Sequence, residues 1–91
     1  MRSIIITGAG SGIGATTALH LERLGWQVFA GVHDPADGEV LARQGSERLQ
    51  VIQLDVTDEQ SVDAFFAEVE KQLDQGGLSA LVNNAGEGIA G

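Results

Sequence analysis

The stretch SIIITGAGSGIG, residues 3–14, decides the fold of this chain. Residues 3–7 carry three consecutive isoleucines and no charge, which predicts a short strand buried on both faces. Four glycines follow within seven residues: Gly8, Gly10, Gly12 and Gly14. Glycine permits tight turns and positive φ angles. After this loop, apolar residues recur at helical spacing up to Gly25, so we expect a strand, a glycine loop and a helix over residues 13–24.

Strand and helix patterns alternate along the rest of the chain. We expect strands over residues 26–32, 49–54 and 78–83, and helices over 34–45 and 59–74. Such alternation with short connections predicts right-handed crossovers and a parallel sheet, that is, an α/β fold. A length of 91 residues allows one domain at most, residues 1–91.

Several residues are typical of element boundaries. Asp34 can cap the second helix, and Pro35 suits its first turn. Thr57 and Gln60 form a capping-box pattern before the third helix, and the glycines at 76–77 are expected to end it. Glutamines at 50 and 53 indicate that strand 49–54 lies at an edge of the sheet.

The glycine loop follows a strand and opens a helix, which is the setting of a pyrophosphate site. Backbone N–H groups at a helix N-terminus, together with the helix dipole, favour a bound phosphate. The alternative is a turn that only packs the helix on the strand. The segments LDVTD, residues 54–58, and NNAG, residues 83–86, follow the third and fourth strands. Since parallel strands end at one side of a sheet, we expect Asp55 and Asn83 to lie beside the loop.

Three motifs at these spacings resemble the N-terminal half of the short-chain dehydrogenase/reductase family. They are formed by Thr7, Gly8, Gly12 and Gly14, by Asp55 and Val56, and by Asn83, Asn84, Ala85 and Gly86. The resemblance covers essentially the whole chain. It implies a Rossmann-like half-domain with four strands in the order 3-2-1-4 and three helices.

The resemblance also implies roles for individual residues toward NAD or NADP. The loop glycines would hold the pyrophosphate, Asp55 would bind the adenine amino group, and Val56 would contact the ring through its backbone. Asn83, Ala85 and Gly86 would lie along the adenosine side. The full set of candidate cofactor-binding residues is Thr7, Gly8, Gly10, Ser11, Gly12, Ile13, Gly14, His33, Asp55, Val56, Asn83, Ala85 and Gly86.

The residues after the second strand give conflicting signals on the choice between NAD and NADP. In the register of the family, an acid that would favour NAD belongs where this chain has Val32, and His33 follows at a position often basic in NADP enzymes. A histidine is mostly neutral at pH 7, so it is a weak phosphate contact. We therefore expect discrimination below about tenfold. Strong exclusion of NADP would instead mean that Asp34 or Asp37 reaches the ribose.

The residues that perform chemistry in this family are a serine and a Tyr-x-x-x-Lys pair. This chain has no tyrosine, and its one lysine is Lys71. We therefore expect no catalytic residue here, and no activity from the chain alone. The sequence is interpreted as the NAD(P)-binding portion of an oxidoreductase. The alternatives are a nucleotide-binding module without catalysis of its own, and an interaction protein that kept the fold.

Composition narrows the remaining possibilities. The chain has no cysteine and two histidines, so we expect no metal site. Its net charge of −8 argues against nucleic acid and anionic membranes as partners. No apolar run approaches the ~20 residues of a membrane span, and we expect a cytoplasmic protein. Strand 78–83 would be an apolar edge, which predicts self-association through it and the face of helix 59–74.

Overall fold

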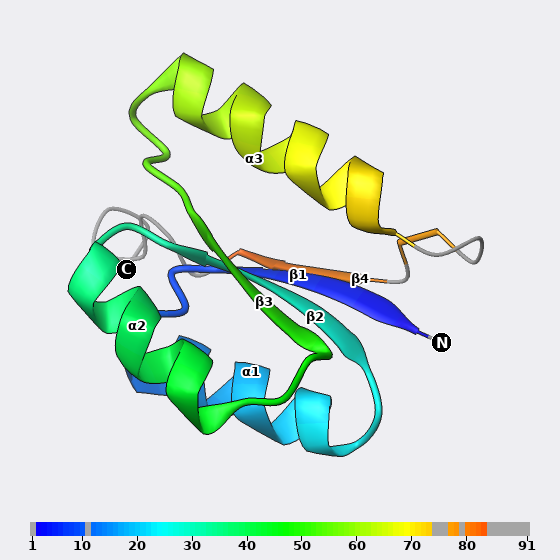
Figure 1. Ribbon diagram of the computed structural model, residues 1–91. Helices are drawn as coiled ribbons and strands as arrows, with labels where there is room; N and C mark the ends of the chain where they lie inside the picture. Colours follow the sequence, from blue (N-terminus) through cyan, green and yellow to red (C-terminus); the bar gives the residue numbers. More distant parts are fainter. Residues whose placement is uncertain (1, 11, 74–76, 79, 84–91) are drawn as a thin grey trace.

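A computed structural model describes residues 2–10, 12–73, 77–78 and 80–83. Strands and helices alternate along the chain (Figure 1). Their bounds are β1 Ser3–Thr7, α1 Gly12–Arg23, β2 Gln27–Val32, α2 Pro35–Gln44, β3 Leu49–Gln53, α3 Glu59–Gln72 and β4 Ala80–Asn83. The alternation expected from the sequence is confirmed, and every element end lies within two residues of the expected position.

The four strands form one parallel sheet in the order β3-β2-β1-β4. Thr7 at the end of β1 pairs with Gly31 of β2 on one side and with Asn83 of β4 on the other. The predicted order 3-2-1-4 and the edge position of β3 are confirmed. The register brings the carboxyl ends of neighbouring strands together, and this sheet end holds the candidate site.

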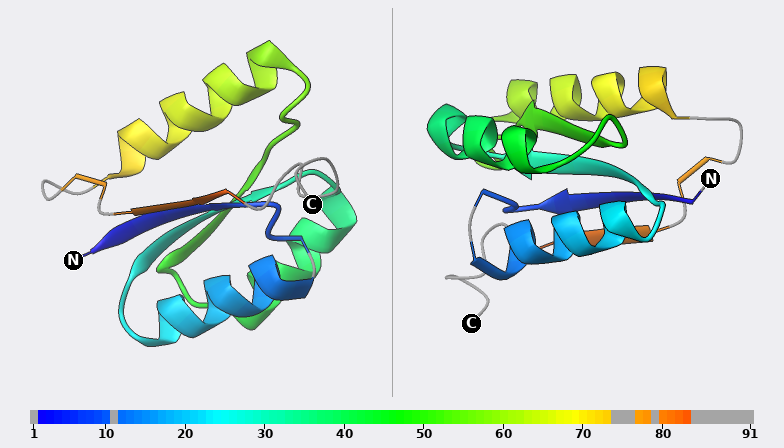
Figure 2. Two further views of the ribbon diagram at one scale, coloured as in Figure 1. Left: turned by 180° about the vertical axis from the view of Figure 1, so that it is seen from behind. Right: turned by 60° about the horizontal axis from the view of Figure 1, so that its bottom comes forward.

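Helices cover the two faces of the sheet unequally (Figure 2). Helices α1 and α2 lie on one face, here called the two-helix face, and α3 lies on the other, the one-helix face. Alternate residues of each strand point to opposite faces, so Ile4 and Ile6 pack on the two-helix face while Ile5 packs on the one-helix face. The one-helix face is completed by four further buried side chains: Phe29, Leu54, Phe65 and Val69.

Most expected helix boundaries are confirmed. Gly25, two residues past the end of α1 at Arg23, has a φ of 98°, a left-handed conformation that suits the glycine that terminates a helix. The side chain of Asp34 accepts a hydrogen bond from Ala36 N at 2.9 Å and caps α2, with Pro35 at the first helical position. Gly45 follows the last residue of α2, as expected.

The capping prediction for α3 was wrong by one residue. Asp58 caps this helix, and its carboxylate accepts a hydrogen bond from Gln60 N at 3.0 Å. Thr57 is instead engaged by Asp55, because its Oγ1 donates to that carboxylate at 2.6 Å. The helix ends at Gln72, before the glycines expected to end it. Leu73 caps it, with its N–H bonded to Val69 O.

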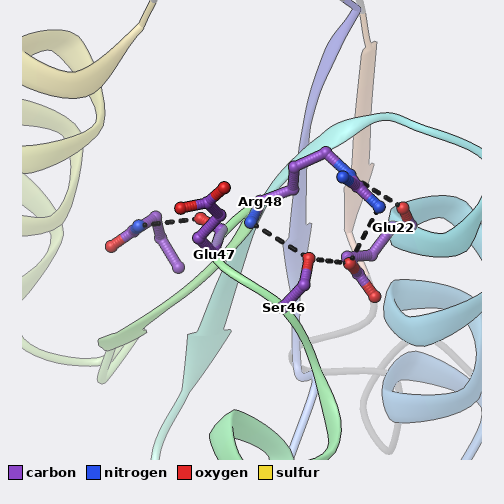
Figure 3. A network of polar contacts seen from close by, with 5 residues as sticks. Glu22, Ser46, Glu47 and Arg48 are labelled. Atoms are coloured by element: carbon purple, nitrogen blue, oxygen red, sulfur yellow. Dashed lines mark hydrogen bonds and ion pairs between the residues drawn. The ribbon is translucent and has the colours of Figure 1, made fainter.

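A polar network ties the C-terminal end of α1 to the turn before β3 (Figure 3). The carboxylate of Glu22 is only 6% exposed and accepts a hydrogen bond from Ser46 Oγ. Arg48 approaches the same carboxylate through Nη2 at 3.4 Å, and its Nε donates to the Glu22 carbonyl at 3.2 Å. A buried charge is stable only when paired in this way, so the network fixes the turn against the two-helix face.

Within the described ranges, each helix is too short or too polar to cross a bilayer.

Candidate functional site

The glycine loop between β1 and α1 is a tightly packed structure. Gly8 and Gly12 have φ angles of 64° and 59°, in the left-handed region that disfavours other residues. A Cβ added to Gly14 would lie 2.4 Å from the Gly8 carbonyl oxygen, so α1 packs directly against the loop backbone. Ala9 N–H donates to Gly31 O at 3.0 Å and anchors the loop to β2. These contacts require glycine at three of the predicted positions.

The first turn of α1 is open and carries no acidic side chain among the described residues. By contrast, α2 and α3 begin with Asp37 and Glu59 in their first turns. A Cβ on Gly12 would meet nothing within 4 Å, and the Ile13 side chain is 79% exposed. The first N–H groups of a helix have no intrahelical acceptor and carry a partial positive charge. This end of α1 can therefore receive an anion.

Asp55 lies just past β3 and is held from several sides. Its backbone N–H donates to Ser61 Oγ at 2.9 Å, which anchors it to α3. Its carboxylate accepts hydrogen bonds from Thr57 Oγ1 at 2.6 Å and from Thr57 N at 3.0 Å. These bonds, with a smaller contribution from the nearby His33, lower the pKa of Asp55 below its ordinary value. Asp55 is thus an ionised acceptor at neutral pH.

His33 extends from the end of β2 toward Asp55. Its Nε2 lies 3.7 Å from Asp55 Oδ2, and its side chain is 76% exposed. The sequence had suggested a contact between His33 and a ribose phosphate, and the pairing with Asp55 was not foreseen. The sequence could have indicated this pairing, because His33 and Asp55 lie just past the ends of two strands that are neighbours in the sheet.

Several of the predicted residues line three separate pockets. One of about 220 Å³ is lined by Gly8, Gly10, Val32, His33, Asp34 and Asp37. Another, of about 250 Å³, lies on the one-helix face and includes Thr7, Val56 and Leu81. Gly12 and Ile13 line a third, along α1. The structure therefore gathers Gly8, Gly10 and His33 at one pocket and places Thr7 and Val56 at the neighbouring one.

Some predicted residues cannot be placed in detail. Ser11, Ala85 and Gly86 lie outside the described residues. The backbone of Asn83 lies opposite Thr7, at the same end of the sheet as the loop.

Val32, at the position where the family register expects an acid, is 2% exposed and packs in the core of the two-helix face. A residue that the sequence named only as an alternative, Asp37, lies beside Gly10 instead. A Cβ built on Gly10 would be 3.2 Å from Asp37 Cβ and 3.3 Å from Asp37 Oδ2.

Comparison with known proteins agrees with this geometry. The sequence model of the short chain dehydrogenase family matches residues 2–91. Estradiol 17-beta-dehydrogenase 2 of Rattus norvegicus is 44% identical over 87 residues, which are 93% of this chain and 23% of that protein. Retinol dehydrogenase 5 of Homo sapiens is 44% identical over 89 residues, 97% of this chain and 28% of that protein. The chain thus spans about a quarter of the length of these relatives.

Solved structures show the same likeness. Glucose dehydrogenase of Caenorhabditis elegans in its apo form superposes with a TM-score of 0.83 at 30% identity, covering 98% of this chain and 39% of that one. A 3-ketoacyl-(acyl-carrier-protein) reductase from Brucella melitensis, complexed with NADH, gives a TM-score of 0.79 at 28% identity over 88% of this chain and 32% of that one. Sequence motifs, sheet order and these likenesses together show that this chain belongs to the short-chain dehydrogenase/reductase family.

Proposed function

We propose that this chain forms the adenosine and pyrophosphate side of an NAD(P) site in an oxidoreductase. The observation that carries the proposal is the glycine loop. Gly14 packs on the Gly8 carbonyl so closely that a Cβ would fill the contact, while the space above Gly12 is open. A pyrophosphate needs this arrangement, because it must approach backbone N–H groups at the start of α1 without side chains in between. The family membership and the NADH complex of a solved neighbour support it.

The bound dinucleotide would supply the hydride in such an enzyme. Residues 8–14 would hold its pyrophosphate. Asp55, ionised and fixed by Thr57, would accept a hydrogen bond from the adenine amino group. His33 would lie at the ribose, beside Gly8 and Gly10. Each of these residues binds or orients the dinucleotide and does not take part in proton transfer.

We further propose that the proton donor for the reaction comes from sequence outside these 91 residues. Reduction of a carbonyl requires a proton donor beside the substrate oxygen. The chain has no tyrosine, its single lysine is on α3, and its relatives are several times longer. The alternative function is a nucleotide-binding module without catalysis. Both functions include binding of the dinucleotide, and they differ only in whether a complementing segment restores turnover.

Ligand-induced stabilisation tests the proposal. NAD, NADP and ADP-ribose are titrated into the chain while the urea midpoint of unfolding is followed. A ligand at 100 times its Kd should stabilise the fold by about 2.7 kcal/mol. Gly12→Val should abolish this stabilisation, because the branched side chain would occupy the space above Gly12 that the pyrophosphate needs.

Gly25→Val is the matched control for that variant. Gly25 also has a positive φ, at 98°, and also has nothing within 4 Å of an added Cβ, but it lies at the opposite end of α1. It should lose stability from backbone strain and still respond to ligand. An unchanged response of Gly12→Val would show that the loop is only a turn.

A further inference from the structure

The two carboxylate oxygens of Asp55 have different surroundings. Oδ1 accepts two hydrogen bonds from Thr57, one from N at 3.0 Å and one from Oγ1 at 2.6 Å. Oδ2 receives neither of these bonds and lies 3.7 Å from Nε2 of His33. In the proposed function, the adenine amino group donates a hydrogen bond to this carboxylate. The amino group must therefore approach the oxygen that His33 faces.

Of the two partners, Asp55 is the one held in place. Its backbone N–H donates to Ser61 Oγ at 2.9 Å, and Thr57 holds Oδ1. The side chain of His33 lies just past the end of β2 and is 76% exposed. A neutral imidazole can turn away from Oδ2 at little cost, because no net charge holds it there. A protonated imidazole is attracted to the carboxylate, so that moving it away costs free energy.

The charged groups that face His33 are carboxylates. Asp34 and Asp37 line the same pocket as His33, and the glycine loop contributes only uncharged residues to its lining. Asp55 faces His33 from the end of β3. Histidine side chains change charge between about pH 8 and pH 5. Asp55 stays ionised through this range, because the hydrogen bonds from Thr57 lower its pKa. Protonation of His33 therefore creates an ion pair where a neutral contact stood before.

We propose that His33 is a pH-dependent gate on the adenine subsite. When protonated, it pairs with Oδ2 of Asp55 and competes with the adenine amino group; when neutral, it turns aside and leaves this oxygen to the ligand. The inference rests on the proposed function, which places adenine at Asp55. Because ion pairs between exposed side chains are weak, we expect affinity to change by about two- to fivefold rather than to be lost.

Calorimetric titration of the chain with NAD at about pH 8 and about pH 5.5 measures the gate. The charge of the NAD pyrophosphate does not change between these values. Wild type should bind NAD about two- to fivefold more weakly at the lower pH. His33→Gln cannot be protonated and should bind NAD with the same affinity at both pH values. His20→Gln is the matched control, since it removes the other histidine, in the last turn of α1, and should keep the wild-type difference.

A measurement without ligand tests the ion pair itself. The carbon NMR signal of the Asp55 carboxyl group should shift between the same two pH values in wild type, because a positive charge appears 3.7 Å from Oδ2. The shift should be much smaller in His33→Gln and unchanged in His20→Gln. A shift of equal size in wild type and His33→Gln would show that His33 does not pair with Asp55, and would overturn the inference.

The outcomes of the titration separate the inference from the function it rests on. Equal affinity of wild type for NAD at both pH values, or a difference that persists in His33→Gln, overturns the gate and leaves the dinucleotide site in place. Stronger binding at the lower pH that depends on His33 would mean that this residue contacts a phosphate, which also overturns the gate. If NAD binds at neither pH, the proposed function itself fails, and the inference fails with it.

Discussion

The two faces of the sheet differ in how completely they are covered. Ile5 of β1 and Leu81 of β4 are paired in register and point to the same one-helix face, yet Ile5 is 0% exposed and Leu81 is 54% exposed. Helix α3 covers the middle of that face and leaves the β4 side open. On the two-helix face, Ile4 and Ile6 are buried under α1 and α2.

The difference shows that burial of a strand residue has two separate causes. Strand periodicity decides which face a side chain points to. The number of crossover helices on that face decides whether it is covered. Val56 and Phe66 are 48% and 43% exposed and line the same apolar pocket as Leu81, so the uncovered region is continuous.

The strongest test of this comparison uses two neighbouring phenylalanines of α3. Phe65 is 0% exposed and Phe66 is 43% exposed, and their rings meet edge-on with centroids 5.3 Å apart. Phe65→Ala should lower the free energy of unfolding by about 3–5 kcal/mol. Phe66→Ala should lower it by about 1 kcal/mol, mostly through the lost ring contact. Urea unfolding measures both, and equal losses would mean that Phe66 is covered in solution.

The polar network at the two-helix face provides the next test. Glu22→Ala removes a side chain that is 6% exposed and leaves Ser46 Oγ and Arg48 Nη2 without their carboxylate acceptor, while Arg48 Nε keeps the backbone carbonyl of residue 22. Because Arg48 is 38% exposed, water can replace part of the interaction, and we expect a loss of about 2 kcal/mol. Glu39→Ala breaks an exposed pair with Arg43 and should cost about 0.3–0.5 kcal/mol. Similar unfolding midpoints for the two variants would contradict this difference.

Self-association should arise from the uncovered part of the one-helix face. Within the part of the chain that the structure describes, β4 is an outermost strand of the sheet, and the outer side of an edge strand can pair with another chain. We expect a dimer through β4 and α3 with an interface of about 1,000 Å² or more. Leu81→Ser should weaken it by about tenfold. Sedimentation at micromolar concentration measures it, with Leu24→Ser as control, since Leu24 is 64% exposed at the far end of α1. A monomeric wild type would contradict the prediction.

The smallest effect on stability is expected at Asp55, just past the end of β3. Thr57→Val removes the Oγ1 donor and keeps the backbone donor, so the pKa of Asp55 should rise toward its ordinary value. A lowered pKa in the fold stabilises it above the unfolded pKa of about 4, and this contribution is lost as pH falls through the folded pKa. Wild type should therefore lose more stability than Thr57→Val between neutral and acidic pH. Carbon-detected NMR titration of the carboxyl group checks the shift, and identical titration curves would refute it.

Short-range patterns in the sequence were sufficient to predict the order and type of the helices and strands. Three isoleucines before a glycine loop predicted β1 and its turn, because strand burial and left-handed glycine are properties of adjacent residues. The cap at Asp34 was predictable for the same reason, since its acceptor serves a backbone N–H two residues away. The cap of α3 was missed because Thr57 has a competing partner in Asp55, and the next residue, Asp58, caps the helix in its place.

The sequence by itself determined a parallel α/β sheet, the glycine loop and the family. Only the tertiary structure decided what those elements bring together. Asp37 meets Gly10, and His33 meets Asp55, across connections that no local pattern encodes. Ile5 and Leu81 are both apolar strand residues and differ in burial because α3 lies over one and not the other. Contacts between distant segments depend on where whole helices pack, and periodicity along the chain carries no information on that placement.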